Sequence, residues 1–508
     1  MSSTFKLKLI RKGSIVSALP QVDKSICIGN EEFTRKTFDN TVNDVKVQYA
    51  KRYGASPIYI VGIGGTYLTQ FIHMSDGRTY AHGDGDWIMG CCGTQEDRWA
   101  YDRCIGNLDG KPQLICNSVD HDTPNRRLTD MRLVSTTGDA WNDCAYHLAR
   151  NGEGWHSGDE DIYCRGGCPE TVWKDDPIKG PNTYWYPRYY DQWHCGEWDN
   201  WLEEPYPMGG GDDWTWADEV ERDYRPVLMF EQNMNFVKMV GMGHGGIGID
   251  ANGKLWTWGY GGWGIIGRPD WPYDNTNRQC VPYNVQPDWD WIDCAGGYFH
   301  CAAIRSDGTL WTWGENWYGQ LGLGKDYSGP GSYQGVPAQV GGDKDWKQVW
   351  AHHETTAAFK DDHSIWYTGA YGLGQMGNGW PDALPPYLTG CLWSGANYLN
   401  LGMTRGGGGR LYNLISVGAY STTATREGKV WTWGMDNRTG ALGLGDRGKW
   451  CSQIPHYIDL PEMIMIHNNG DHTIAVDEDW NVWWWGELYG QTYVPTMIPF
   501  NFLSGVAT

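Results

Sequence analysis

The sequence predicts an all-β fold, a seven-bladed β-propeller of four-stranded blades that is closed by a C-terminal strand and carries loop insertions. Two observations predict it. The 508 residues include 70 Gly, 32 Trp and 30 Tyr but only 10 Phe, and glycine stands at about twice its usual share of roughly 7%. Such an excess indicates that one short motif has been copied many times. In addition, a Trp-x-Trp-Gly segment recurs behind a tight turn at a spacing typical of one propeller blade.

The repeat is defined by the glycine that closes each of these segments. Successive glycines are separated by 75, 101, 55, 55, 65 and 52 residues. The short spacings give a unit of about 52–55 residues, and the long ones indicate insertions at about 91–131, 159–223 and 389–413. The seven glycines are Gly83, Gly158, Gly259, Gly314, Gly369, Gly434 and Gly486.

Each unit is expected to be a β-meander. Turn pairs such as Asp76-Gly77, Asn252-Gly253 and Asp307-Gly308 precede the closing glycines, and Asn-Gly or Asp-Gly favours a type I′ hairpin with positive φ at both central residues. The residues on either side alternate with period two, as Lys254–Trp258 does, which is typical of strands.

A proline-marked strand opens most of the units. It contains Pro226, Pro282, Pro337 or Pro455, and because proline donates no backbone hydrogen bond, this strand is expected at the edge of a blade. The C-terminal segment 493–498 repeats this strand with no unit after it, whereas the first unit, near Ile58, has none of its own. The last strand is therefore predicted to complete blade one and close the ring.

The chain thus divides into an N-terminal arm, residues 1–57, and a propeller, residues 58–508. The arm has ten Lys or Arg and five Asp or Glu, a net charge of +5, within a chain whose net charge is −21. Phe5–Leu9 alternates like an exposed strand. The arm could lie against the propeller's own acidic surface or dock on an acidic neighbour in an assembly.

The central repeats resemble those of the regulator of chromosome condensation family, in the Trp-Thr-Trp-Gly form that is similar to repeats of bacterial and bacteriophage proteins. The resemblance rests on Leu310–Asn316, on Gly319–Gly324 and on Gly297-Tyr298-Phe299-His300. It implies a seven-bladed propeller and a structural or protein-binding role. The family's best-known function, nucleotide exchange on a small GTPase while docked to chromatin, is not expected here, because the acidic charge opposes chromatin docking and fold alone does not fix function.

Composition also bears on compartment and chemistry. No apolar run approaches the roughly 18 residues of a membrane span, and the N-terminus lacks the features of a signal peptide. We therefore expect synthesis in the cytoplasm, and the 14 cysteines to be mostly buried thiols. No phosphate-binding loop or zinc protease motif is present, and Gly241-x-Gly243-x-x-Gly246 is interpreted as part of a blade. The sequence predicts neither a cofactor nor an enzyme.

Two recurrent side chains are interpreted as structural. Tryptophans at two repeat positions are expected to fill the wedges between blades. They are Trp256, Trp311, Trp366 and Trp431 at one position and Trp258, Trp313 and Trp433 at the other. His300 and His472 recur at one repeat position and are expected to form hydrogen bonds between blades.

The insertion 159–223 is the candidate contact surface. It contains 17 Asp or Glu, 5 Lys or Arg and 13 aromatic residues. It could be an aromatic-packed cap, a protein contact surface whose carboxylates select a cationic partner, or a sugar-binding site. Cys164, Cys168, His194 and Cys195 are weak candidates for a metal site because their spacing is unusual. The candidate contact residues are Tyr184, Trp185, Tyr186, Tyr189, Tyr190, Trp193, Trp198, Trp201, Asp212, Asp213, Trp214 and Trp216.

The function that the sequence favours is a non-enzymatic structural and interaction platform. The resemblance implies a virion component of a bacteriophage, at the tail or the particle surface, that contacts a partner protein or a host surface. The alternatives are an intracellular regulator of a GTPase-like partner and a lectin-like glycan-binding propeller. Nucleic acid and membrane insertion are not expected.

Overall fold

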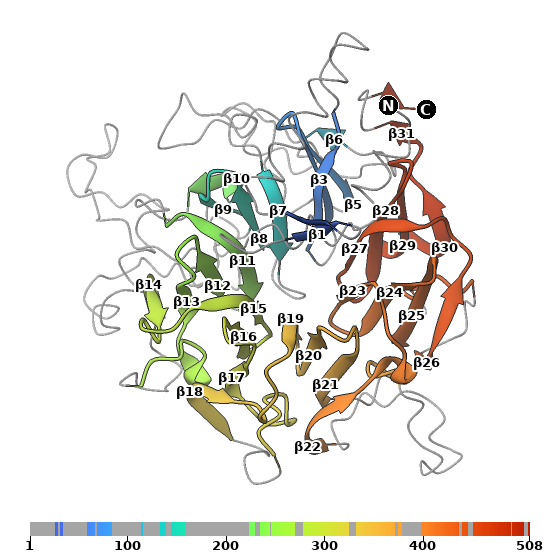
Figure 1. Cartoon of the computed structure of the whole chain (residues 1–508). Coiled ribbons are helices and arrows are strands. Elements are labelled where there is room, and N and C mark those ends of the chain that lie inside the picture. Colours follow the sequence, from blue (N-terminus) through green and yellow to red (C-terminus); the bar gives the residue numbers. More distant parts are fainter. Residues whose placement is uncertain are drawn as a thin grey trace, which may run out of the picture.

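The computed structural model shows sheets arranged as blades around a central axis (Figure 1). The all-β propeller class predicted from the repeat is therefore confirmed. The structure describes residues 26–28, 31–33, 58–66, 69–83, 113–114, 133–138, 144–158, 223–228, 234–243, 245–269, 278–324, 332–370, 374–377, 398–435, 439–445, 451–488, 490–501 and 506–507.

Five of the sheets in the ring have four antiparallel strands each, in chain order from the axis outward (Figure 1). The Trp-x-Trp-Gly segment is the third strand in four of them, and in the remaining sheet Trp366-Tyr367-Thr368-Gly369 takes this place. Alternating side chains of this strand pack on both faces of a blade. These sheets are β11 (Phe236–Met242), β12 (Gly245–Asp250), β13 (Leu255–Tyr260) and β14 (Arg278–Val285); β15 (Trp291–Gly296), β16 (His300–Arg305), β17 (Leu310–Glu315) and β18 (Tyr333–Gln339); β19 (Trp346–His352), β20 (Thr355–Lys360), β21 (Ile365–Ala370) and β22 (Tyr398–Arg405); β23 (Leu414–Val417), β24 (Ser421–Arg426), β25 (Lys429–Met435) and β26 (Cys451–Ile458); β27 (Met463–Asn468), β28 (His472–Asp477), β29 (Val482–Leu488) and β30 (Gly490–Met497).

The prediction of seven blades is wrong, because the structure has six. The first two repeat units form one eight-stranded sheet in which the inner strands β3 and β7 pair in parallel, with Gly65 opposite Thr137. A Cβ atom on Gly62 would lie 2.2 Å from the Val134 carbonyl oxygen, and one on Gly64 would lie 2.0 Å from that of Thr136. The absence of side chains there lets the two backbones meet. The strands are β3 (Ile60–Gly65), β4 (Thr69–Met74), β5 (Thr79–Gly83), β6 (Gln113–Leu114), β7 (Leu133–Gly138), β8 (Cys144–Ala149), β9 (Gly154–Gly158) and β10 (Asp223–Leu228).

The predicted closure by a shared C-terminal strand is also wrong. Strand β30 pairs with β29 of its own sheet, with Trp484 opposite Thr496. The outer position beside β5 is already taken by β6, which lies inside the predicted insertion 91–131. Likewise β22 lies inside the predicted insertion 389–413. The proline strands are the outer edges of blades, as expected, but they end a unit rather than open it.

Side-chain packing closes the ring instead. One apolar cluster joins Ile60 and Ile72 of the first sheet to Ile474 and Val482 of the last. The Asn469 side-chain amide also donates a hydrogen bond to the Thr66 carbonyl oxygen. Strands β3 and β27 accordingly lie side by side (Figure 1).

The tight turns depart from the predicted type I′ form. Gly77 has φ of 100°, but the Asp76 before it has no positive φ; among the predicted turn pairs that the structure describes, only Glu427-Gly428 has positive φ at both residues, 53° and 71°. The Gly77 amide donates to the Met74 carbonyl oxygen and the Met74 amide to that of Arg78, so the loop has three residues and ends in a left-handed glycine. The aspartate side chain also accepts a hydrogen bond from the Arg78 amide, which favours this turn.

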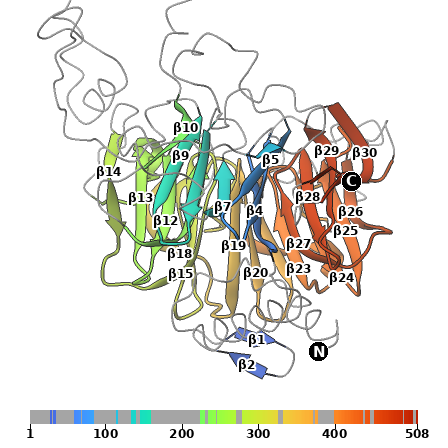
Figure 2. The ribbon, with the colours of Figure 1, turned by 90° about the horizontal axis from the view of Figure 1, so that it is seen from above.

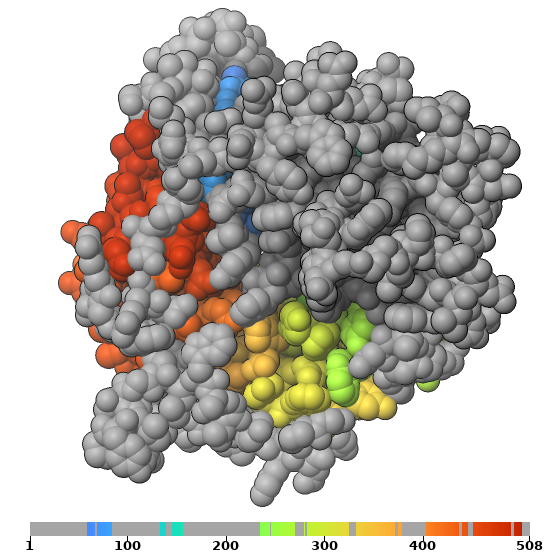
Figure 3. All heavy atoms as spheres, turned by 180° about the vertical axis from the view of Figure 1, so that it is seen from behind, coloured from blue at the N-terminus to red at the C-terminus, as the bar shows by residue number. Residues whose placement is uncertain are grey.

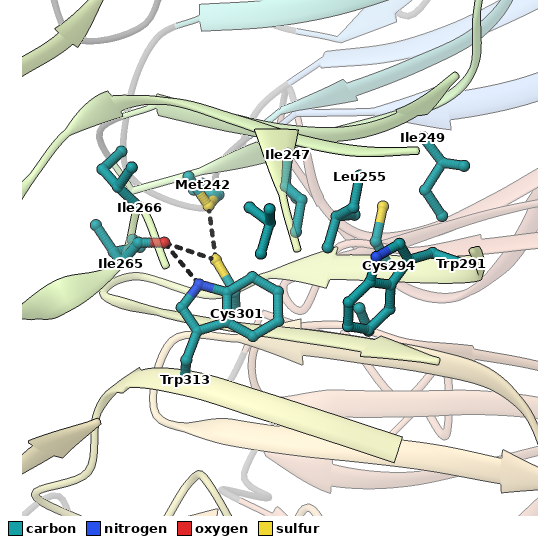
Figure 4. Close-up of a cluster of buried hydrophobic side chains, with 12 residues drawn as sticks. Met242, Ile247, Ile249, Leu255, Ile265, Ile266, Trp291, Cys294, Cys301 and Trp313 are labelled. Atoms are coloured by element: carbon teal, nitrogen blue, oxygen red, sulfur yellow. Dashed lines mark hydrogen bonds between the residues drawn. The ribbon is translucent and has the colours of Figure 1, made fainter. Parts of the chain in front are cut away.

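The apolar core lies between neighbouring blades. Figure 4 shows Trp313 of β17 next to Ile265, which follows β13; its indole Nε1 donates to the Ile265 carbonyl oxygen at 2.8 Å. Trp258, Trp313 and Trp433 are fully buried, as predicted. The other set, Trp256, Trp311, Trp366 and Trp431, packs against the buried clusters as well, but these side chains are only partly buried.

Cysteines occur in both chemical states. Cys294 and Cys301 are buried free thiols of the cluster in Figure 4, and burial raises the pKa of Cys294 to about 12. Cys451 is disulfide-bonded. The N-terminal arm contributes a short antiparallel pair, β1 (Ile26–Ile28) and β2 (Glu31–Phe33). Near the C-terminus, β31 (Phe500–Asn501) pairs with β32 (Val506–Ala507).

Candidate functional site

The ring has two faces of different construction. We call "turn face" the side that carries the tight turns between second and third strands. We call "insertion face" the opposite side, which carries the loops between first and second strands and the ends of the third strands. Figure 2 shows the ring edge-on, with the β1–β2 pair beyond the turn face. Strand β9 ends at Gly158 and strand β10 begins at Asp223, both on the insertion face. The long segment between them therefore leaves and re-enters the ring there.

The site residues predicted from the sequence lie outside the described residues. This holds for the aromatic and acidic candidates between Tyr184 and Trp216, and for Cys164, Cys168, His194 and Cys195. They remain predictions. Within the described ranges, no group of three His, Cys, Asp or Glu side chains could hold a metal ion.

A row of five aromatic rings crosses the insertion face. The Tyr260 and Phe299 ring centroids are 5.7 Å apart, and those of Phe299 and Tyr298 are 4.3 Å apart. Tyr298 stacks on His353 at 5.7 Å with an interplanar angle of 16°, and His353 contacts Tyr420 at 5.7 Å. All five side chains are partly exposed. We name these residues the aromatic row.

The repeat itself produces the aromatic row. Tyr260 directly follows the closing Gly259, and the other four rings belong to loops that link first and second strands. The Glu315 amide donates to the Phe299 carbonyl oxygen at 2.8 Å, and the Met435 amide to that of Tyr420. Each loop is thereby tied to the end of its third strand, so equivalent positions in successive blades become neighbours. Figure 3 shows this side of the molecule, where atoms from the yellow-green to the orange part of the chain form one surface.

A pair of carboxyl groups lies beside the aromatic row. Glu315 ends β17 and is only 7% exposed, and Glu354 follows His353 in the next blade. Burial, and then the nearby charge of Glu354, raises the pKa of Glu315 to about 7. Burial also raises the pKa of Glu354 to about 7, although a hydrogen bond from the Tyr318 side chain opposes this. Each group thus disfavours the charge of the other.

Positive charge is absent from the described loop positions around this pair. No Lys or Arg occurs in the loops between first and second strands at 297–299, 353–354, 418–420 and 469–471. The same holds for the residue that follows the closing glycine of each of β13, β17, β21, β25 and β29. Burial lowers the pKa of His353, and it lowers the pKa of His352 and of His467 to about 4. These imidazoles are therefore neutral at pH 7, and the charged residues at these loop positions, Glu315, Glu354, Asp471 and Glu487, are all acidic. Arg278, at the start of β14, lies opposite Tyr260.

The turn face, unlike these loop positions, includes cations in direct contact with rings and carboxylates. There Arg305 lies 4.3 Å from the Trp289 ring centroid, and the Lys360 Nζ lies 4.6 Å from that of Trp346. The Lys360 Nζ also lies 2.6 Å from an Asp343 carboxylate oxygen and 3.0 Å from one of Asp345.

The repeat-position histidine behaves as the sequence predicts where its partner is described. The His300 Nε2 lies 2.9 Å from the Thr356 Oγ1 of the next sheet, which is a hydrogen bond between blades. Burial lowers the pKa of His300 to about 3. The sequence prediction missed the role of its neighbours Tyr298 and Phe299, which it quoted only as part of the motif.

The raised pKa values predict that stability falls as pH rises. The pKa of Glu315 is near 7 in the folded state, against an ordinary value of 4.5. Between pH 4.5 and 7 the folded state therefore binds more protons than the unfolded state. The associated stability is complete below about pH 4.5 and lost as pH rises through about 7. Glu315→Gln should therefore raise the unfolding free energy by about 2 kcal/mol at pH 8 and leave it nearly unchanged at pH 4.5. Denaturant titration at both pH values checks this, and an equal effect at both would contradict it.

Comparison with known proteins defines the class. Residues 252–304, 307–359 and 427–476 match the family "Regulator of chromosome condensation (RCC1) repeat", and 292–320 match a second family of that description. Among solved structures, Prp20p from Saccharomyces cerevisiae has a TM-score of 0.55 at 16% identity and covers 82% of each chain. Human WBSCR16 has a TM-score of 0.54 at 16% identity, covering 82% of this chain and 87% of that one. The protein is a β-propeller, and the matched segments resemble RCC1 repeats.

Curated relatives match over part of the chain. The Arabidopsis thaliana mitochondrial RCC1 domain-containing protein RUG3 is 28% identical over 280 residues, which are 51% of this chain and 57% of the relative. The ultraviolet-B receptor UVR8 of the same plant is 28% identical over 272 residues, which are 50% of this chain and 54% of the relative. The chain thus spans about half the length of these relatives. Within the described ranges, no helix has the length and apolar character needed to cross a membrane.

Proposed function

We propose that this protein is a non-enzymatic interaction platform that holds a protein partner on its insertion face. The aromatic row carries the proposal. Tyr and Trp are enriched at the energetic centres of interfaces because they bury a large rigid surface at low entropic cost. Five partly exposed rings in contact with one another are unusual on a face that needs no core of its own.

The charge of the face indicates the chemistry of the partner. The described loop positions around the aromatic row lack Lys and Arg but include Glu315, Glu354 and Asp471. Complementary charge steers association and excludes partners of like charge. We therefore infer a partner that presents a basic segment. The structure of Prp20p is reported with its binding properties to Gsp1p and histones, which supports a protein partner for a propeller of this kind.

The finer expectations from the sequence differ in their support. The described relatives include proteins of Arabidopsis thaliana and human, so they give no support to a bacteriophage particle or a host surface. A regulator of a GTPase-like partner remains the alternative. The lectin-like alternative depends on insertion 159–223, and a glycan array with Trp198→Ala and Trp214→Ala variants tests it.

Loss of aromatic side chains from the row should weaken partner binding. Binding partners captured by the purified chain from lysate of its source cells are identified by mass spectrometry, and the affinity of the leading partner is then measured. Tyr298→Ser combined with Tyr420→Ser should weaken that affinity at least about tenfold, because buried interface aromatics each contribute on the order of 1–2 kcal/mol.

Tyr457→Ser is the matched control. Tyr457 is 55% exposed on the outer strand β26, away from the insertion face, and its replacement should leave affinity within about twofold. Equal affinity for the wild type and the double variant would place the partner elsewhere and contradict the proposal.

A further inference from the structure

Glu315 has no positively charged partner in the described structure. The only hydrogen bond that its carboxylate accepts from a described residue comes from the Gln320 Nε2 to Oε2, at a long 3.4 Å. The His353 Nδ1 lies 3.8 Å from the Glu354 Oε1, but that imidazole is neutral. Two carboxyl groups that repel each other in a largely buried place are costly unless a cation joins them. Glu315 and Glu354 together therefore have the features of an unfilled cation site.

The surroundings select the kind of cation. The parallel Tyr298–His353 stack adjoins Glu354, and Tyr298 is held in place because its amide donates to the His353 carbonyl oxygen at 3.3 Å. Aromatic faces attract organic cations. A planar guanidinium can lie on such a stack and donate hydrogen bonds to two carboxylates, whereas an ammonium acts as a point charge. A metal ion would need more ligands than the described residues supply.

We propose that Glu315, Glu354 and the Tyr298–His353 stack form a site for the guanidinium group of an arginine on the partner protein. The inference rests on the proposed function and names the chemistry recognised at the centre of the insertion face. The aromatic row supplies contact area, and the arginine supplies the charge that the carboxyl pair lacks. This site gives specificity for arginine over lysine.

Binding should depend on pH, because only the ionised pair attracts the cation. The groups that face the pair are Tyr318 and Gln320 from the loop after β17, His353 from the β19–β20 loop, and the uncharged Ala370 at the end of β21. None of them carries a positive charge at pH 7. Arginine binding should therefore strengthen as pH rises from 5.5 to 8.

The test uses the full chain and small probes. Saturation-transfer difference NMR is recorded with N-acetyl-arginine amide, N-acetyl-lysine amide and N-acetyl-citrulline amide, the last being a neutral isostere of arginine. We expect a dissociation constant of about 1–10 mM for the arginine probe, at least threefold weaker binding of the lysine probe, and no binding of citrulline. Binding at pH 5.5 should be at least about fivefold weaker than at pH 8.

Two variants locate the site. Glu315→Gln with Glu354→Gln should abolish arginine binding at pH 8, and thermal unfolding of this variant confirms that it is folded. Glu427→Gln, at a 76% exposed side chain on the turn face, should bind like the wild type. Equal binding of citrulline, unchanged binding by the Glu315/Glu354 variant, or no arginine binding at all would overturn the site. If the partner still requires Tyr298 while the probes fail, the platform stands and the arginine site falls.

Discussion

Replacing Gly64 with alanine should destabilise the protein by at least about 3 kcal/mol, because the new Cβ has no room. It would lie 2.0 Å from the Thr136 carbonyl oxygen and 3.0 Å from the carbonyl carbon. Both are backbone atoms of β7, so no side-chain rotation relieves the clash. The β3–β7 pairing at Gly65 and Thr137 would have to separate, which would split the eight-stranded sheet at its joint. Denaturant unfolding followed by tryptophan fluorescence measures the loss.

Gly342→Ala is the control for the glycine-to-alanine change itself. A Cβ on Gly342 would meet nothing within 4 Å, so its effect on the unfolding free energy should stay within about 0.5 kcal/mol. A Gly64→Ala protein as stable as the control would show that β3 and β7 do not approach as closely as the structure places them.

Trp313→Ala should cost about 3–5 kcal/mol of stability, the range found when a large aromatic is removed from a core. Its side chain is fully buried between two sheets and contacts the cluster that contains Met242 and Cys301. The substitution also leaves the Ile265 carbonyl oxygen without the indole hydrogen bond at 2.8 Å. Differential scanning calorimetry should show a clear decrease in Tm relative to the wild type.

Trp311→Ala is the matched control, since Trp311 is two residues away in the same strand but only partly buried. Its indole Nε1 donates within its own turn, to the Thr309 Oγ1 at 2.8 Å. Its loss should cost about half as much as that of Trp313, in proportion to the smaller buried area. Similar costs for both would mean that the two tryptophan sets are equivalent, as the sequence alone predicted.

Part of the candidate site could be read from the sequence and part could not. Tyr298, Phe299 and His300 stand in one quoted motif, and the hydrogen-bonding role of His300 followed from its recurrence. Glu315 and Glu354 lie in different repeats, and each is unremarkable in its own segment. They become a pair only because the end of a third strand in one blade lies beside the loop between first and second strands of the next. A signal was available in the absence of Lys and Arg from those loop positions.

The repeat, the β-meander of each unit and the propeller class can be read from the order of the amino acids, because turn residues and alternating side chains act over a few residues. The position of the proline strands at blade edges follows in the same way. Three features depend on packing between distant segments: six sheets form the ring, β6 and not β30 flanks β5, and apolar contacts close the circle. Those outcomes depend on which distant backbones can approach each other. At Gly62 and Gly64 the decisive feature is a missing side chain facing a strand about 70 residues away, and no local pattern records that.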